Sequence, residues 1–100
     1  MNEGDKHDGG KVRYELLPTY PIRETAKVLT LGAKKYTDRN WEKGFKWSRA
    51  YGATHRHLAA WWDREDLDPE TGINHLAHVL CEVMFLLEFT RTHSKHDDRP

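Results

Sequence analysis

The chain has 100 residues, a length that suits one small domain. Sixteen basic side chains balance sixteen acidic ones, so the chain lacks the net positive field that attracts a nucleic-acid polymer. Its one cysteine, Cys81, lies in an apolar run and indicates a small core residue in a reducing compartment. No apolar run approaches the roughly 20 residues that cross a bilayer. The sequence therefore predicts a cytoplasmic protein without a nucleic-acid or membrane partner.

The two ends of the chain differ in composition from its middle. Residues 1–10 are polar and contain glycine, and residues 92–100 are charged without periodicity, so both ends are predicted to be flexible. Residues 11–91 form the predicted helical domain. A chain this short buries only about 60–65% of the surface of its unfolded form, so we expect self-association.

Helical periodicity predicts an all-α fold with three main helices. The first helix is expected to begin near Pro21, whose missing N–H costs nothing in a first turn, and to end near Tyr36. The following segment TDRNWEKGFKW has no helical period and predicts a loop. Ser48 is a suitable N-cap for a second helix that ends near Arg64, before a turn at Asp68.

The third helix is expected to begin near Asn74 and carries the clearest apolar stripe of the sequence. Two short helices cannot cover so long a stripe, so the sequence predicts a bundle that is completed by a homodimer or a larger homo-oligomer. The stripe consists of Leu76, Val79, Leu80, Val83, Leu86 and Leu87.

A polar line runs beside this stripe on the third helix. At 100° per residue, His75, His78 and Glu82 fall within about 60° of one another. His57 of the second helix shares a face with small side chains that let another helix approach. Two histidines at i and i+3 can bind a metal ion with a ligand from a neighbouring helix. The simpler interpretation is that they form hydrogen bonds within the bundle and bind no metal.

Acidic side chains collect at the end of the second helix and in the following turn. Magnesium or manganese ions bind several oxygen ligands at close range, and Glu65, Asp68 and Glu70 can supply them. The alternative is a solvated loop in which Asp68 has only a capping role.

Cations and aromatic rings gather around the first loop. They can pair with phosphate and stack on a base, and stacking contributes roughly 1–3 kcal/mol per base. In the alternative interpretation the rings belong to the core and the lysines to a hydrated surface. The candidate nucleotide-binding residues are Lys11, Arg13, Lys34, Lys35, Tyr36, Asn40, Trp41, Arg56 and His57.

The segments DGGKVRYELLP, VLTLGAKKYTDRNWEKG, HRHLAAWWDREDLDPETG and NHLAHVLCEVMFLL resemble, in this order, the N-terminal domain of phage dATP/dGTP diphosphohydrolases. The resemblance covers nearly all of residues 8–91. It implies a purine nucleotide ligand and an enzyme that converts dATP or dGTP to the monophosphate and pyrophosphate with Mg²⁺ or Mn²⁺. The family is similar to the all-α MazG-type pyrophosphohydrolases, which assemble as dimers or tetramers.

Two departures from the MazG pattern bear on the site. The acidic motifs E-E-x-x-E and E-x-x-D are absent, and His75 and His78 stand in the place of the second.

We expect the first loop to form one wall of a nucleotide pocket, with the three histidines near its floor. The candidate catalytic residues are His57, His75, His78 and Glu82, and the wall residues are Lys35, Tyr36, Asn40 and Trp41.

Two other functions are compatible with these patterns. One is a phage module that sequesters a nucleotide or a cyclic (di)nucleotide immune signal without cleaving it, which would need no cofactor and would act against host defence in the host cytoplasm. The other is a helical assembly protein whose histidines are core residues.

Overall fold

The computed structural model describes residues 3–100, and this part of the chain is all-α, as the sequence predicts. An isolated antiparallel bridge joins Leu67 and Asn74 in the connection between the last two long helices. None of the helices in the described part is long and apolar enough to cross a membrane. With η for a 3-10 helix, the elements are η1 (Tyr14–Leu16), α1 (Thr19–Lys35), η2 (Asn40–Lys43), α2 (Trp47–Trp62), α3 (His75–Thr92) and η3 (Ser94–His96).

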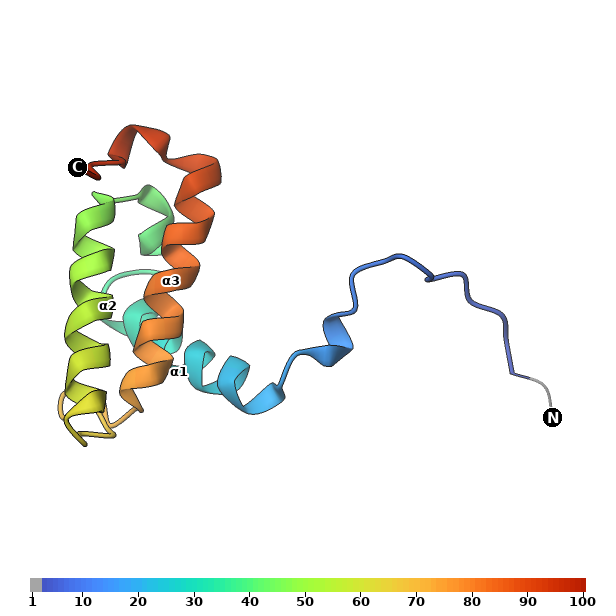
Figure 1. The fold of residues 1–100 in the computed structure, drawn as a ribbon, viewed down its shortest axis with the longest axis horizontal. Helices are drawn as coiled ribbons and strands as arrows, with labels where there is room; N and C mark the ends of the chain where they lie inside the picture. Colours follow the sequence, from blue (N-terminus) through green and yellow to red (C-terminus); the bar gives the residue numbers. More distant parts are fainter. Residues whose placement is uncertain (1–2) are drawn as a thin grey trace.

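Helices α2 and α3 lie side by side and form the main body of the molecule (Figure 1). The buried side chains include Ala50 of α2 and Ala77 and Cys81 of α3, and small residues of this kind let two helices approach closely. Phe89 near the end of α3 is fully buried. The core is therefore narrow in the middle of the pair and filled by an aromatic ring near one end.

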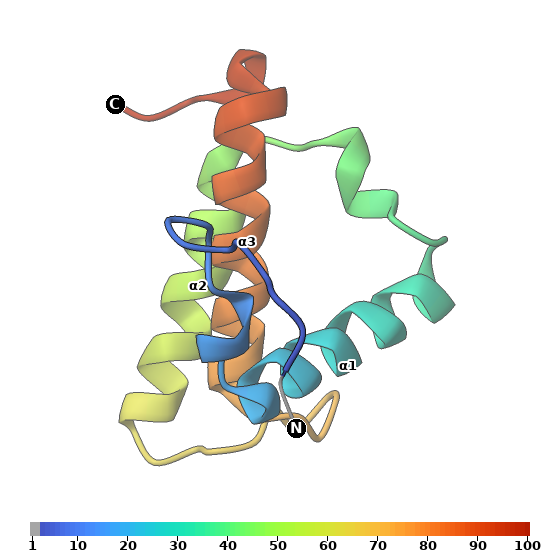
Figure 2. The same ribbon diagram turned by 90° about the vertical axis from the view of Figure 1, so that its right-hand side faces the viewer.

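Helix α1 packs against α3. Residues 36–46, which we call the arch, then extend outward and return to α2 through η2 (Figure 2). Thr25 is the buried residue of α1, and Val28 and Leu29 are half-buried. Ile22, near the beginning of α1, is 50% exposed. The contact of α1 with α3 thus leaves part of its apolar side uncovered.

The apolar stripe predicted as the core side of the third helix is largely outside the fold of this chain. Leu80, Val83 and Leu87 are 42%, 46% and 71% exposed. The buried side carries the polar line instead, with His75 and His78 only 4% and 9% exposed. The other stripe residues, Leu76, Val79 and Leu86, are half-buried. One chain therefore covers the stripe only in part, because α2 and the turn before α3 supply polar partners that draw the histidines inward. Oligomerisation across the stripe stays a prediction.

The helix ends follow the sequence in one case and depart from it in another. Asn74 is the N-cap of α3, and its side chain accepts the backbone N–H of Leu76 at 2.8 Å, as predicted. The N-cap of α2 is Lys46, not Ser48. Ser48 lies in the first turn and donates its backbone N–H to the Asp98 carboxylate at 2.9 Å. A distant acidic side chain therefore does the capping that the sequence assigned to a local hydroxyl.

This contact belongs to the segment 92–100, for which the sequence predicts a flexible tail. In the structure, α3 continues to Thr92 and η3 follows it. The guanidinium of Arg99 lies 4.9 Å from the centre of the Trp47 ring. The segment thus packs against the beginning of α2.

Candidate functional site

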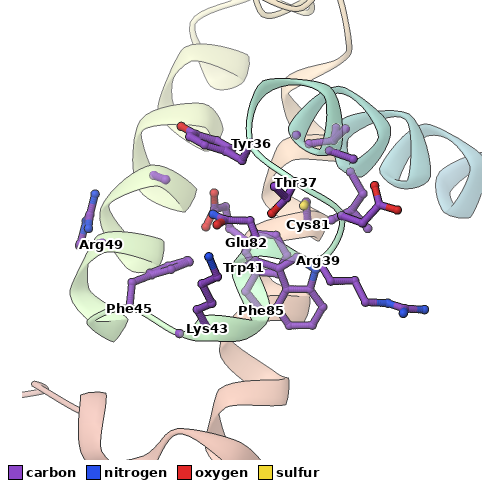
Figure 3. Close-up of a pocket in the computed structure, with 18 of the residues that line it drawn as sticks. Tyr36, Thr37, Arg39, Trp41, Lys43, Phe45, Arg49, Cys81, Glu82 and Phe85 are labelled. Atoms are coloured by element: carbon purple, nitrogen blue, oxygen red, sulfur yellow. The ribbon is translucent and has the colours of Figure 1, made fainter.

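An open cavity of about 1220 Å³ lies between α1, the arch and the α2–α3 pair (Figure 3). Ligand pockets commonly measure roughly 300–1,000 Å³, so the cavity has room for a nucleotide. Its cations come from the arch and from α2, and its aromatic rings come from the arch and from α3. The charged and aromatic lining residues are Tyr36, Asp38, Arg39, Trp41, Lys43, Phe45, Arg49, Arg56, Glu82 and Phe85.

An aromatic cluster forms part of the cavity wall. The rings of Trp41 and Phe85 stack with centroids 4.8 Å apart and planes at 22°. Phe45 meets the Phe85 ring edge-on at 6.2 Å and the Phe89 ring at 5.1 Å. Trp41 therefore packs the arch onto α3 and lines the cavity at the same time.

Four cations and two carboxylates line the cavity, although the whole chain has no net charge. In Figure 3, Lys43 lies near the middle of the cavity lining, whereas Arg49 and Arg39 extend toward opposite sides of it. All three are exposed, and Arg49 lies over the Phe45 ring at 6.0 Å from its centroid. Exposed cations beside aromatic faces are suited to phosphate and base together.

Glu82 is the half-buried carboxylate of the cavity, and its surroundings oppose its ionisation. Burial raises the pKa of Glu82 from its ordinary value to about 7, while the nearby positive charge of Arg56 acts in the opposite direction. A carboxylate with this pKa can accept a proton near neutral pH, as a general base does.

The structure brings some of the predicted nucleotide-binding residues to this cavity and leaves others outside its lining. Tyr36, Asn40, Trp41 and Arg56 line it. The lysines before Tyr36 are exposed and are absent from the lining, and the ammonium of Lys35 lies 5.3 Å from the centre of the Tyr36 ring.

The remaining predicted binding residues lie elsewhere. Lys11 and Arg13 are exposed in the segment before α1, where Arg13 pairs with Glu15 at 2.7 Å. His57 is absent from the cavity lining. The pocket wall is therefore built from α1, the arch, α2 and α3, without the segment before α1.

The three predicted histidines meet in a histidine cluster, which we define as His57, His75 and His78 with their partners Glu65, Asp68 and Thr71. A hydrogen bond of 2.8 Å joins the Nδ1 atoms of His57 and His75. His75 Nε2 lies 2.8 Å from a carboxylate oxygen of Glu65. A neutral His75 that donates to Glu65 accepts at Nδ1, so His57 donates to His75.

Within this cluster, the rings of His57 and His78 stack with centroids 4.5 Å apart and planes at 8°. Burial lowers the pKa of His57, and the neighbouring His78 lowers it further. Burial also lowers the pKa of His78, against the attraction of Asp68. Both imidazoles are therefore neutral at physiological pH, and the cluster is a buried polar network rather than the floor of the cavity, since none of its members lines the cavity.

The acidic trio predicted to hold a metal ion does not converge. Asp68 is 8% exposed and faces the histidines, with Oδ2 3.6 Å from His57 Nδ1. Glu65 pairs with His75, and the side chain of Glu70 is exposed. The one group of three possible metal ligands among the described residues is His57, Asp68 and His78.

Sequence reasoning missed six of the charged and aromatic cavity residues, namely Asp38, Arg39, Lys43, Phe45, Arg49 and Phe85. A signal for Arg49 was present, because residues seven apart share a helix face and Arg49 stands seven residues before Arg56. No local pattern marks Arg39, which adopts a left-handed backbone with φ 55°.

The fold and the cavity together define an all-α protein with an open cavity lined by cations and aromatic rings. The chain belongs to the family described as dATP/dGTP diphosphohydrolase, N-terminal, whose pattern matches residues 1–99. A protein of Salmonella phage PMBT28 named dATP/dGTP diphosphohydrolase is 35% identical over 96 residues. This match covers 96% of the chain and 33% of the phage protein, so the chain spans about a third of its relative. No solved structure matches the chain significantly.

Proposed function

We propose that the cavity binds a purine deoxynucleoside triphosphate and that the protein acts as a nucleotide diphosphohydrolase. The observation that carries the proposal is the meeting of Arg49, Arg56 and Lys43 with the Trp41 and Phe45 rings in one open cavity. A triphosphate needs several cations, and a purine needs a flat apolar surface. Membership of the family and the name of the phage relative support dATP and dGTP as the first substrates to test.

In the proposed reaction, a water molecule attacks the α-phosphorus. A new O–P bond forms while the bond from the α-phosphorus to the bridging oxygen breaks, and pyrophosphate leaves with that oxygen. Glu82, which lines the cavity and has a pKa of about 7, accepts the proton of the attacking water. Arg56 and Arg49 stabilise the negative charge that develops on the phosphate oxygens.

The triphosphate is proposed to bind as its Mg²⁺ or Mn²⁺ complex, which lowers the charge that the protein must neutralise. Asp38 and Glu82 are the carboxylates of the cavity lining, and they are the oxygen donors that would face the cation. Glu65 and Glu70 lie outside that lining and have no part in this proposal.

The test compares Arg56→Ala with the matched control Lys35→Ala, since both residues are exposed cations but only Arg56 lines the cavity. Calorimetric titration with dGTP should show at least a tenfold loss of affinity in Arg56→Ala, which corresponds to about 1.4 kcal/mol. Lys35→Ala should bind as the wild type does. Melting temperatures of both variants should stay close to that of the wild type, because neither side chain is buried.

Product analysis completes the test. Chromatography after incubation with dGTP and Mg²⁺ should show dGMP and pyrophosphate, and Glu82→Gln should bind dGTP but release at least tenfold less product. Recovery of intact nucleotide from the denatured wild-type protein would mean sequestration without cleavage, a function for which the comparisons give no support. Wild-type affinity in Arg56→Ala would place the nucleotide site elsewhere.

A further inference from the structure

The histidine cluster contains a group of possible ligands that the nucleotide cavity does not use. We propose that His57, Asp68 and His78 bind one divalent transition-metal ion, of which Zn²⁺ is the probe. One donor atom from each residue lies within 4.8 Å of the other two. None of the three residues lines the cavity, so the metal site does not depend on the proposed function.

The distances fit an ion after a small adjustment. Oδ2 of Asp68 is 3.6 Å from Nδ1 of His57 and 3.8 Å from Nε2 of His78. Zinc bonds of 2.0–2.1 Å at tetrahedral angles set two ligand atoms about 3.4 Å apart. These two separations exceed this value by a few tenths of an ångström, which small side-chain rotations can supply. The donor atoms of His57 and His78 lie within 4.8 Å of each other, so these two stacked rings make the larger movement.

The carboxylate is held in place for this role by its own turn. Oδ1 of Asp68 accepts the backbone N–H groups of Glu70 at 2.7 Å and Thr71 at 3.3 Å. The Asp68 backbone also bonds to Ile73 and Gly72, at 2.9 and 2.7 Å. Oδ2 is the atom that faces the two imidazoles, and it makes no hydrogen bond to any of the residues 3–100. A rigid carboxylate with one such oxygen is a suitable metal ligand.

The donor set selects the class of ion. Two imidazoles and one carboxylate suit zinc, cobalt and related ions, whereas magnesium prefers oxygen ligands and retains several waters. Three protein ligands leave at least one coordination position for water. The hydroxyl of Thr71 is hydrogen-bonded to His78 Nε2 at 2.8 Å, so an ion at this nitrogen replaces that hydrogen bond.

Ion binding must also change two other features of the cluster. An imidazole holds a metal ion in its ring plane, so the nearly parallel rings of His57 and His78 have to tilt. An ion at Nδ1 of His57 also replaces the proton that this atom shares with His75. The tilt and the lost hydrogen bond should change the NMR signals of these particular imidazole rings when the ion binds.

The experiment titrates the metal-free protein, without an affinity tag, with Zn²⁺ and with Co²⁺. We expect one ion per chain by calorimetry, and visible d–d absorption bands for the Co²⁺ form that a tenfold excess of Mg²⁺ leaves unchanged. His57→Asn and His78→Gln keep a polar atom near the lost nitrogen, and each should weaken Zn²⁺ binding at least tenfold. The matched control is the His93→Asn, His96→Asn double variant, which removes a half-buried stacked histidine pair outside the cluster and should bind Zn²⁺ as the wild type does.

A second measurement keeps the test decisive if a variant fails to fold. Long-range ¹H–¹⁵N NMR spectra of the wild-type protein should show Zn²⁺-induced shifts at Nδ1 of His57 and Nε2 of His78, and none at His55, which is exposed on α2. The proposal is overturned if the wild type binds no Zn²⁺, if the double variant loses the ion, or if the shifts appear on other histidines.

Discussion

Glu82 links the stability of the protein to the chemistry of its cavity. Burial raises its pKa from 4.5 to about 7, so the folded state favours the protonated form. For an acid with a raised pKa, the unfolding free energy falls as pH rises from the unfolded value through the folded value. Protonation of Glu82 also lowers the negative charge that the proposed nucleotide would meet in the cavity near neutral pH.

Replacing Glu82 with Gln should remove this dependence, because the amide resembles the protonated acid. Urea unfolding curves of the two proteins should agree near pH 4.5 and separate up to pH 8, where the variant should be more stable by about 2 kcal/mol after allowance for partial solvent access. The lowered pKa values of His57 and His78 make the unfolding free energy rise with pH, but this contribution is the same in both proteins and cancels in their difference. Glu88→Gln is the control, since Glu88 lies on the same helix with its side chain 37% exposed. Parallel curves for wild type and Glu82→Gln would mean that Glu82 is charged in the folded protein.

At the scale of the elements, the arch depends on one glycine that connects η2 to α2. Gly44 has φ 84°, a conformation that other residues rarely adopt. A Cβ at this position would also clash with the ring of His93, which follows α3. Backbone conformation and close approach therefore both require glycine where the arch meets the end of α3.

Gly44→Ala should lower the unfolding free energy by at least about 1–2 kcal/mol, the cost of a left-handed alanine, with the clash added. Gly32→Ala in α1 is the control, because nothing lies within 4 Å of the added carbon and Gly32 is helical. It should leave stability unchanged or raise it by about 0.5–1 kcal/mol. Thermal and urea unfolding measure both effects, and equal stabilities for the two variants would contradict this account of the arch.

At the scale of the whole molecule, this chain exposes more surface than a compact one of its mass. Its accessible area is 8565 Å², whereas about 5,900 Å² is typical for a monomer of this size. Its radius of gyration of 17.0 Å exceeds the roughly 13 Å of a compact 100-residue domain. The segment before α1 extends away from the helices (Figure 1). The excess area of one chain is larger than the 1,200–2,000 Å² that a stable protein interface buries in total over both partners.

Two apolar surfaces contribute to this excess and remain uncovered. One is the face of α3 with Leu80, Val83 and Leu87. The other is the segment before α1, where Val12 is 79% and Leu16 67% exposed. We propose that a second copy of the chain covers both, because the segment extends away from the α3 face of its own chain and supplies apolar side chains that such a face needs.

The double variant Val83→Glu, Leu87→Glu should therefore convert an oligomer into a monomer. Sedimentation equilibrium of the wild type at micromolar concentration should give a multiple of the 11.8 kDa chain mass, and the variant should give 11.8 kDa. Leu58→Glu, which alters an exposed leucine of α2, is the control and should keep the wild-type mass. A wild-type mass of one chain would contradict the proposal.

The sequence by itself determined the local features of this protein. The three helices, the cap at Asn74 and membership of the family follow from patterns within short stretches of chain, because capping and periodicity depend on neighbours in sequence. The meeting of the three histidines also follows from helix spacing, once α2 and α3 pair. Cations and rings near the first loop were likewise visible before folding, although their role was not.

Only the tertiary structure decided which faces are buried. Periodicity identifies the two sides of α3 but not the side that α2 covers, and the polar partners Glu65 and Thr71 placed the histidines inward. The path of residues 36–46 beside α2 places Arg39 and Arg49 in the cavity lining and leaves Lys35 outside it. Which residues are buried or line the cavity depends on contacts between residues far apart in the chain, and no local sequence pattern predicts the free energies of those contacts.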